Sequence, residues 1–130
     1  MVKFILSKNR LYWWPIKIRM PSSDERKAGQ VEEFTFKAQF EAIGSEEAQG
    51  IMDEVSKLPD DERTARQHDL LLRVVKDWNE DIQDEDKEPI PFGTDTLRTI
   101  LDDPWILVAF WRAWGESMSG DGARKGNSQR

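Results

Sequence analysis

The single histidine and the carboxylate beside it are the first residues whose types could do catalytic chemistry. His68 is followed directly by Asp69, in a chain that has no cysteine. A His–Asp pair can act as a general base, but adjacent residues of a helix do not face each other, and no Ser or Thr is placed by the sequence as its nucleophile. We therefore expect a histidine at the edge of the core, no catalytic residues and a non-enzymatic protein.

The absence of cysteine also bounds metal chemistry. Without thiols, a disulfide scaffold and a Cys-ligated zinc site are excluded, and one histidine cannot form a multi-His site. Asp84, Asp86 and Glu88 alternate like the ligands of a calcium loop, but such a loop needs glycine at its sixth position, where this chain has Pro89. The spacing predicts a solvated acidic loop, with no metal site and no cofactor.

Basic and aromatic residues alternate along one predicted strand. Trp13, Lys17 and Arg19 fall on its outward face. Such a pattern can bind single-stranded nucleic acid by stacking and phosphate contacts. The formal net charge is −6, and the acidic remainder of the chain would repel a phosphate backbone. We expect no nucleic acid here and favour an acidic partner surface, another copy of this chain included.

The last predicted helix is apolar nearly all round. Such a helix is either central in a core or covered by a partner. Leu107, Met118 and three aromatic residues share one broad face, with Trp105 and Ala109 on the opposite side. Because Trp is enriched where interfaces bind most strongly, Trp105 is the predicted anchor. The candidate partner-binding residues of this helix are Trp105, Phe110, Trp111 and Trp114.

The elements that carry these residues follow from hydrophobic periodicity. Alternation predicts a first strand with Val2, Phe4 and Leu6, a second from Leu11 to Met20 and a third around 34–41. Pro15 cannot donate a ladder hydrogen bond, which indicates an edge position or a bulge. The predicted inward face of the sheet comprises Trp14, Ile16, Ile18, Phe34, Phe36 and Phe40.

Helical periodicity replaces this alternation after residue 44. One helix is predicted to begin at Ser45, and a second follows Pro59 and carries an apolar face that ends at Trp78. An acidic loop over 79–92 contains a short extended piece around Ile90. A short helix begins at Thr94, and Asp103-Pro104 opens the last one. The fold class is therefore α+β: about three N-terminal antiparallel strands, then about four helices.

Length and charge complete this organisation. The chain of 130 residues fits one domain, predicted over 1–118 with strands in 1–42 and helices in 45–118, followed by a flexible polar tail at 119–130. Residues 1–20 hold five basic residues and no acidic one. The longest apolar run, 105–111, is far shorter than the roughly 20 residues that span a bilayer, and no signal peptide is visible. We expect a cytosolic protein without membrane contact.

The second half resembles a known family. Its pattern is a Trp that closes a helix, an acidic turn, a Pro-x-Pro-Phe-like extended piece over 78–92, a short helix with Leu97 and Leu101, and a final apolar helix from Asp103-Pro104 to Trp114. Together with the upstream strand 34–40, this resembles the tail assembly chaperones of long-tailed bacteriophages. Lys87 stands where the family pattern has glycine in the acidic turn.

The resemblance implies a non-enzymatic helper of tail assembly. Such proteins bind the tape measure protein, keep it in solution and help to recruit the tail tube protein. They commonly self-associate, and their genes are often read through a frameshift to give a longer product. The resemblance also implies a protein of the bacterial host cytoplasm that is not part of the mature virion.

An alternative function uses the carboxylates themselves. Acidic clusters at 60–62 and 81–86 would suit a phage-encoded decoy that imitates DNA phosphates and inhibits a basic host protein. Such binding would weaken with salt, whereas a chaperone that holds apolar client segments would tolerate salt.

Overall fold

Two long antiparallel strands form most of the sheet. The computed structural model describes residues 3–6 and 8–119. Strands β1 (Leu11–Pro21) and β2 (Val31–Glu41) pair as an antiparallel hairpin, and a single 3-10 turn, η1 (Glu25–Lys27), lies in their connection. The register pairs even-numbered with even-numbered residues, so the apolar positions of both strands share one face of the sheet.

The third strand comes from later in the chain than the sequence predicts. Strand β3 (Val75–Trp78) pairs antiparallel with β2, which gives the order β1-β2-β3. The predicted first strand is wrong: Phe4 and Leu6 lie in an exposed segment without regular structure, and Val2 lies outside the described residues. The sheet is antiparallel and three-stranded as predicted, but a different segment completes it.

The free edge of β1 carries residues that disfavour pairing with a further strand. The backbone N–H of Ala42 donates to the Arg10 carbonyl, and that of Ser22 donates to the Gln30 carbonyl, at the two ends of the hairpin. Because hydrogen-bonded pairs alternate along an antiparallel ladder, the even-numbered residues of β1 bond to β2 and the odd-numbered ones direct their backbone groups to the open edge. Pro15 and the cationic side chains of β1 stand at these odd positions. Proline and cations are typical protections of a free edge, and the prediction that Pro15 marks an edge strand is confirmed.

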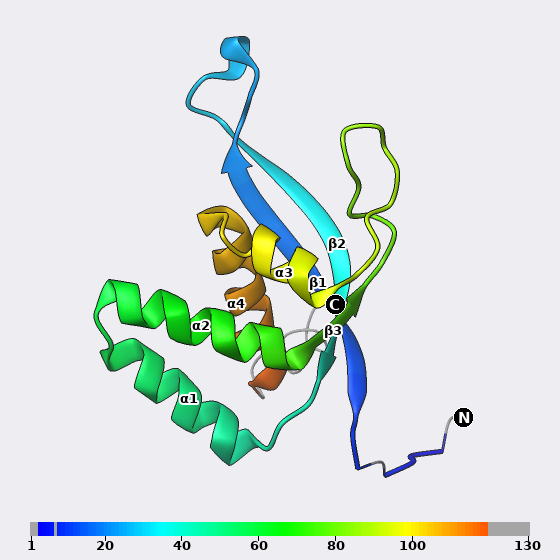
Figure 1. Ribbon diagram of the computed structural model, residues 1–130, viewed down its shortest axis with the longest axis vertical. Coiled ribbons are helices and arrows are strands. Elements are labelled where there is room, and N and C mark those ends of the chain that lie inside the picture. The colour runs from blue at the N-terminus through cyan, green and yellow to red at the C-terminus, as the bar shows by residue number, and fades with distance from the viewer. Residues whose placement is uncertain (1–2, 7, 120–130) are drawn as a thin grey trace, which may run out of the picture.

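Four helices cover one face of this sheet, and the α+β class is confirmed. They are α1 (Ser45–Lys57), α2 (Asp60–Val74), α3 (Thr94–Ile100) and α4 (Pro104–Met118). Helix α4 packs on β1, and α2 packs against α4 from the other side (Figure 1). The buried side chains form one continuous apolar core between the sheet and the helices.

Helix α2 is shorter than its apolar pattern predicts. It ends at Val74, and the next four residues are extended, although the predicted helical face continues to Trp78. Pairing with β2 buries Val75 and Trp78 in the core. The adjacent valines, Val74 and Val75, are β-branched and favour a helix only weakly, so the gain from this burial decides for a strand. The Trp78 indole donates a 2.6 Å hydrogen bond to the Ile90 carbonyl and so ties the acidic loop to the sheet.

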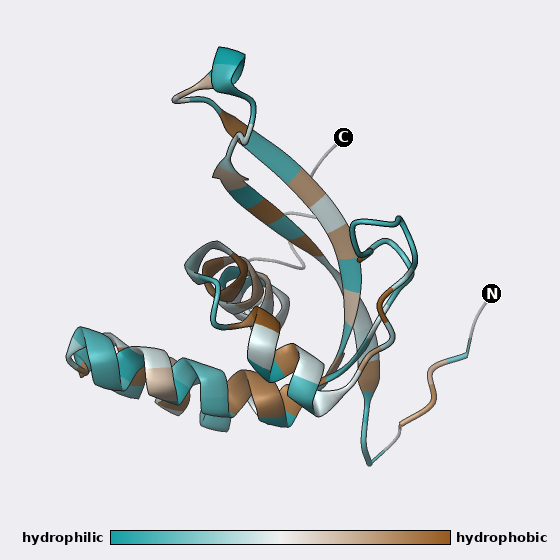
Figure 2. Ribbon diagram, turned by 45° about the horizontal axis from the view of Figure 1, so that its top comes forward, coloured by the Kyte–Doolittle hydropathy of each residue, from teal (hydrophilic) through white to brown (hydrophobic). Residues whose placement is uncertain are grey.

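The far half of the hairpin extends beyond the helices. Figures 1 and 2 show the two strands continuing past α4, and the hydropathy colours of Figure 2 alternate between apolar and polar along the strands. Phe34 lies opposite Ile18 on the inner face but remains 49% exposed, so its predicted place in the core is wrong. The alternation identifies the face correctly, but the helical layer ends before it reaches Phe34. Trp14 is half-buried against the core, and Trp78 is buried as predicted.

Two further predictions concern membrane-spanning segments and the C-terminal tail. Among the described residues, no helix combines the length and the apolar character that crossing a bilayer requires. Except for Ser119, the predicted flexible tail lies outside the part of the chain that the structure describes.

Candidate functional site

Helix α4 begins at the Asp103-Pro104 pair, one residue before Trp105. Pro104 occupies the first turn, and the Asp103 carboxylate accepts hydrogen bonds from the backbone N–H groups of Trp105 (2.9 Å) and Ile106 (3.3 Å). This is the cap that the Asp-Pro pair predicts. Trp105 follows in the first turn and is 46% exposed.

The broad aromatic face of α4 belongs to the core. Phe110 and Trp114 are fully buried, and the Phe110 ring lies 5.7 Å from that of Phe36 on the sheet. Trp111 is half-buried and its ring centroid is 5.2 Å from that of Trp114. The prediction that Phe110 and Trp114 contact a partner is therefore wrong. Because α4 lies between the sheet and α2, its widest apolar face is covered within the chain.

The outward stripe of α4 runs along Trp105, Val108 and Arg112. Val108 is 52% exposed and Arg112 is also exposed. Ala109 was expected on this side but is buried, so the exposed stripe passes through Val108 in its place. Trp105 and Val108, three residues apart, form one apolar patch. We call these two residues the α4 stripe.

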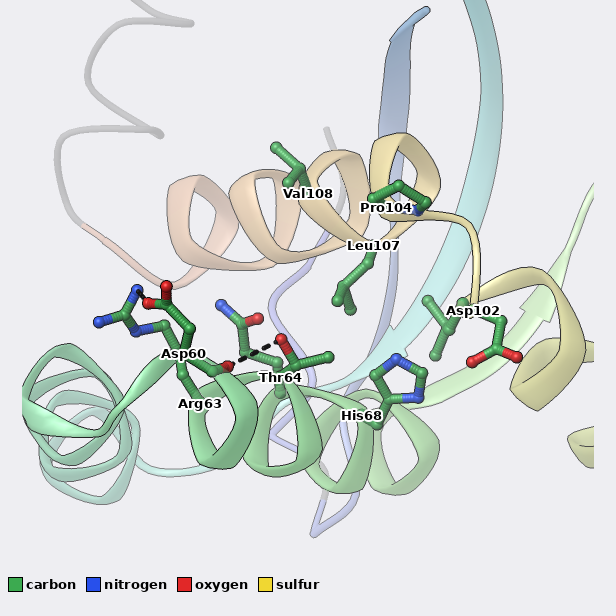
Figure 3. Close-up of a pocket in the computed structure, with 10 residues that line it drawn as sticks. Asp60, Arg63, Thr64, His68, Asp102, Pro104, Leu107 and Val108 are labelled. Atoms are coloured by element: carbon green, nitrogen blue, oxygen red, sulfur yellow. Dashed lines mark hydrogen bonds and ion pairs between the residues drawn. The ribbon is translucent and has the colours of Figure 1, made fainter.

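A pocket lies beside the α4 stripe, between α2 and the beginning of α4. Its volume is about 390 Å³, and Leu107 points from α4 toward α2 while His68 points back across the space (Figure 3). We call it the α2–α4 groove. Its lining residues are Asp60, Arg63, Thr64, Gln67, His68, Leu101, Asp102, Pro104, Leu107 and Val108.

The polar side chains on the α2 wall are engaged in structural contacts. Arg63 pairs with Asp60 at 3.0 Å and donates to the carbonyls of Val55 and Leu58 at the end of α1. The Thr64 hydroxyl donates to the Asp60 carbonyl at 3.0 Å. These bonds hold the α2 wall in place. The floor of the groove is apolar and includes Leu101 and Leu107, and its rim includes Asp60 and Asp102.

His68 is half-buried in this wall, at the edge of the core as predicted. Asp69 is exposed and is not among the residues that line the groove. The two side chains therefore do not form a shared site. In the described part of the chain, no three His, Cys, Asp or Glu side chains are grouped closely enough to hold a metal ion.

The other predicted partner-binding residues lie on a second surface. Trp13, Lys17 and Arg19 are exposed on the outer face of the sheet, which no described helix covers. Arg19 pairs with Glu33 across the hairpin at 3.1 Å. Lys17 has no ion pair with any described residue, and neither has Lys37, its diagonal neighbour on β2. The predicted residues thus divide among this outer face, the α4 stripe and the core.

The two acidic clusters lie on opposite sides of the molecule. Asp60, Asp61 and Glu62 begin α2, whereas the loop after β3 lies beyond the other end of that helix (Figure 1). Within this loop, the Asp84 carboxylate accepts the N–H groups of Asp86 (2.9 Å) and Glu88 (3.0 Å). The two acidic clusters are therefore separated by the length of α2.

The shifted pKa values belong to residues outside the groove. Burial raises the pKa of the Tyr12 hydroxyl, which shares a 2.7 Å hydrogen bond with Ser117 that acts in the opposite direction. A hydrogen bond from Arg73 at 2.9 Å lowers the pKa of Glu47. The first contact joins β1 to the end of α4, and the second joins α1 to α2.

Sequence reasoning missed most of the groove. Val108 has a signal, since it stands three residues after Trp105 and repeats at helical spacing with it. Leu101, His68 and Asp102 carry no such signal, because they meet only when α2 packs against the α3–α4 junction. No protein-family model, curated protein or solved structure matches this chain. The comparisons therefore assign no partner to the α4 stripe or to the groove.

Proposed function

We propose that this protein is a non-enzymatic tail assembly chaperone of a long-tailed bacteriophage, which binds the tape measure protein and helps to recruit tail tube subunits. The observation that carries the proposal is the α4 stripe: Trp105 and Val108 are about half exposed beside an open groove. Trp is enriched among the residues that contribute most to protein–protein binding, which makes an exposed Trp beside a pocket a candidate anchor for a client. The resemblance over the second half of the chain supplies the identity of the client.

The groove suits an amphipathic helix of the client. Such a helix would place apolar side chains, three or four residues apart, against Val108, Leu107 and Trp105. Asp60 and Asp102 at the rim would face basic side chains that flank the apolar ones. Long helical clients with repeated apolar faces aggregate when free, and the acidic surface around the groove would keep the complex in solution.

The outer face of the sheet provides a second, separate contact. Trp13 and Lys17 are exposed there, on the side of the sheet that faces away from α4. A partner with acidic side chains, such as a tail tube subunit, can therefore be recruited without displacing the client. In this proposal the chaperone acts in the host cytoplasm and leaves before the virion is complete.

The test is co-expression with a fragment of the tape measure protein. In the variant W105A/V108S we expect the fragment to shift from the soluble to the pelleted fraction, because both substitutions remove apolar contacts of the α4 stripe. The matched control is W13A/V31S, which changes a Trp and a Val of similar exposure, 47% and 63%, on the sheet. The control should retain the fragment in solution.

Salt separates this proposal from the acidic decoy. Apolar client binding should persist at about 1 M NaCl, where charge interactions beyond about 3 Å are screened. If W105A/V108S folds and still holds the client, or if moderate salt abolishes binding by the wild type, the α4 stripe is not the client site.

A further inference from the structure

The N-terminal segment carries the most exposed apolar side chains of the described chain. Phe4, Ile5 and Leu6 are 77%, 75% and 87% exposed, and none of them packs against the core. They follow Lys3, and Lys8 comes soon after. Three consecutive large apolar residues in water are unfavourable, so this basic, apolar segment has the composition of a strand or strap that binds elsewhere.

The α2–α4 groove has the complementary composition. Its floor includes Leu101 and Leu107, and half-exposed Val108 stands at its side. Its rim carries two exposed carboxylates: that of Asp102, and that of Asp60, which pairs with Arg63 at 3.0 Å. The volume of about 390 Å³ equals that of about a dozen water molecules, which is room for more than one large side chain.

We propose that the segment Lys3–Leu6 of one copy of this chain occupies the α2–α4 groove of a second copy. Apolar side chains of the segment would enter the groove, and Lys3 and Lys8 would face Asp60 and Asp102. The proposal shares its groove with the client site described above, but it does not require the client to be a tape measure protein.

The geometry favours a second copy over insertion in the same chain. The segment leaves the body on the side of β3, whereas the groove opens between α2 and the start of α4, across the molecule (Figures 1 and 3). In both ribbon views the segment extends away from the helices. A segment and a groove are different surfaces, so two copies can exchange segments reciprocally, or each copy can engage two neighbours in a ring or an open series.

Such a contact would couple self-association to client binding. The segment covers the groove while no client is present, which hides apolar surface from aggregation. A client helix must displace the segment, so client binding and self-association compete for one site.

The test is sedimentation velocity of two variants and their mixture. F4S/L6S removes the segment and keeps the groove, whereas V108E keeps the segment and places a carboxylate in the groove. All three side chains are at least half exposed, so both variants should fold, which circular dichroism and thermal unfolding check. Each variant alone should associate on the order of 100-fold more weakly than the wild type, since F4S/L6S loses two apolar contacts and V108E would bury a carboxylate in an apolar contact.

Mixing the two variants gives the decisive result. F4S/L6S supplies an intact groove and V108E an intact segment, so the mixture should form a one-to-one pair that does not grow further. The control V31S, another exposed apolar site, should associate like the wild type. A monomeric wild type, unaltered association of F4S/L6S, or a mixture that stays monomeric would overturn the proposal.

The same variants separate this inference from the proposed function. F4S/L6S should still bind the tape measure fragment, and more tightly than the wild type, because its groove is uncovered. V108E should lose both activities. Loss of self-association in F4S/L6S together with no binding of the fragment by any variant would refute the client and leave the contact between copies intact.

Discussion

The two sides of α4 differ in what covers them, although both are rich in large apolar residues. Phe110 and Trp114 face the sheet and are completely buried, whereas Trp105 and Val108 face outward and stay about half exposed. The outward side also carries the charged residues Arg112 and Glu116, but Trp105 and Val108 are as apolar as the buried residues, so the hydrophobicity of a residue alone does not show whether it is buried. What distinguishes them is whether a second layer of this chain packs there. The same contrast separates Phe36 from Phe34 on β2.

The largest expected difference is between two Trp residues on α4. We expect W114A to lower the free energy of unfolding by about 3–5 kcal/mol, because it leaves a cavity in the core. We expect W105A to change it by less than about 1 kcal/mol, because the side chain is partly in water already. Urea denaturation followed by circular dichroism measures both. Similar losses in the two variants would mean that Trp105 is part of the core.

The second comparison uses two Phe residues on the same face of one strand. F36A should lower the free energy of unfolding by about 3 kcal/mol or more, since Phe36 is 4% exposed and packs on Phe110. F34A should cost about 1 kcal/mol or less, because no helix reaches the far half of the hairpin. Chemical denaturation of both variants checks the difference. An equal cost would show that Phe34 is covered in solution by something else.

A smaller change in the free energy of unfolding is expected in the acidic loop, where side-chain packing contributes little and the backbone conformation matters more. Lys87 has a φ angle of 64°, in the left-handed region that favours glycine. We expect K87G to raise the free energy of unfolding by about 0.5–1 kcal/mol. Glycine adopts this φ angle without strain, and the strain energy removed from the folded state exceeds the stability lost because glycine makes the unfolded chain more flexible. The melting temperature reports it, and K76G, at an extended position of β3, is the destabilising control.

The smallest effect concerns pH. The pKa of Glu47 is lowered in the folded state by its hydrogen bond with Arg73, so the stabilisation is present above the ordinary carboxyl pKa and is lost as the pH falls through the lowered value. In R73Q, the pKa of Glu47 measured by NMR titration should return toward its ordinary value. An unchanged titration of Glu47 in R73Q would show that the ion pair does not form in solution.

Much of the fold can be predicted from local pattern. The alternation over 11–20 and 34–40, the helices after residue 45 and the Asp103-Pro104 cap each depend on neighbours in sequence, and the structure has all of them. The third strand was not predictable in this way. Val75–Trp78 is too short to show a period, and it becomes a strand only because β2 offers a free edge beside it.

The candidate site was predictable only in part. Trp105 is exposed as expected of an anchor, while Phe110 and Trp114 are not, because the sequence shows that α4 is apolar all round without showing which side the sheet takes. The groove joins residues from α2 and from the α3–α4 junction, more than thirty positions apart. Trp13, Lys17 and Arg19 lie together on the outer face as their alternation predicts.

The sequence by itself determined the elements, the apolar face of each and the separation of a basic N-terminal stretch from an acidic remainder, because periodicity and charge are local properties of the chain. The tertiary structure decided which apolar faces are covered. The helices cover only the near half of the hairpin and only the inner side of α4, so Phe34, Trp105 and Val108 remain open to water. Coverage depends on the lengths and packing of elements far apart in sequence, and this is why it could not be deduced from any one of them.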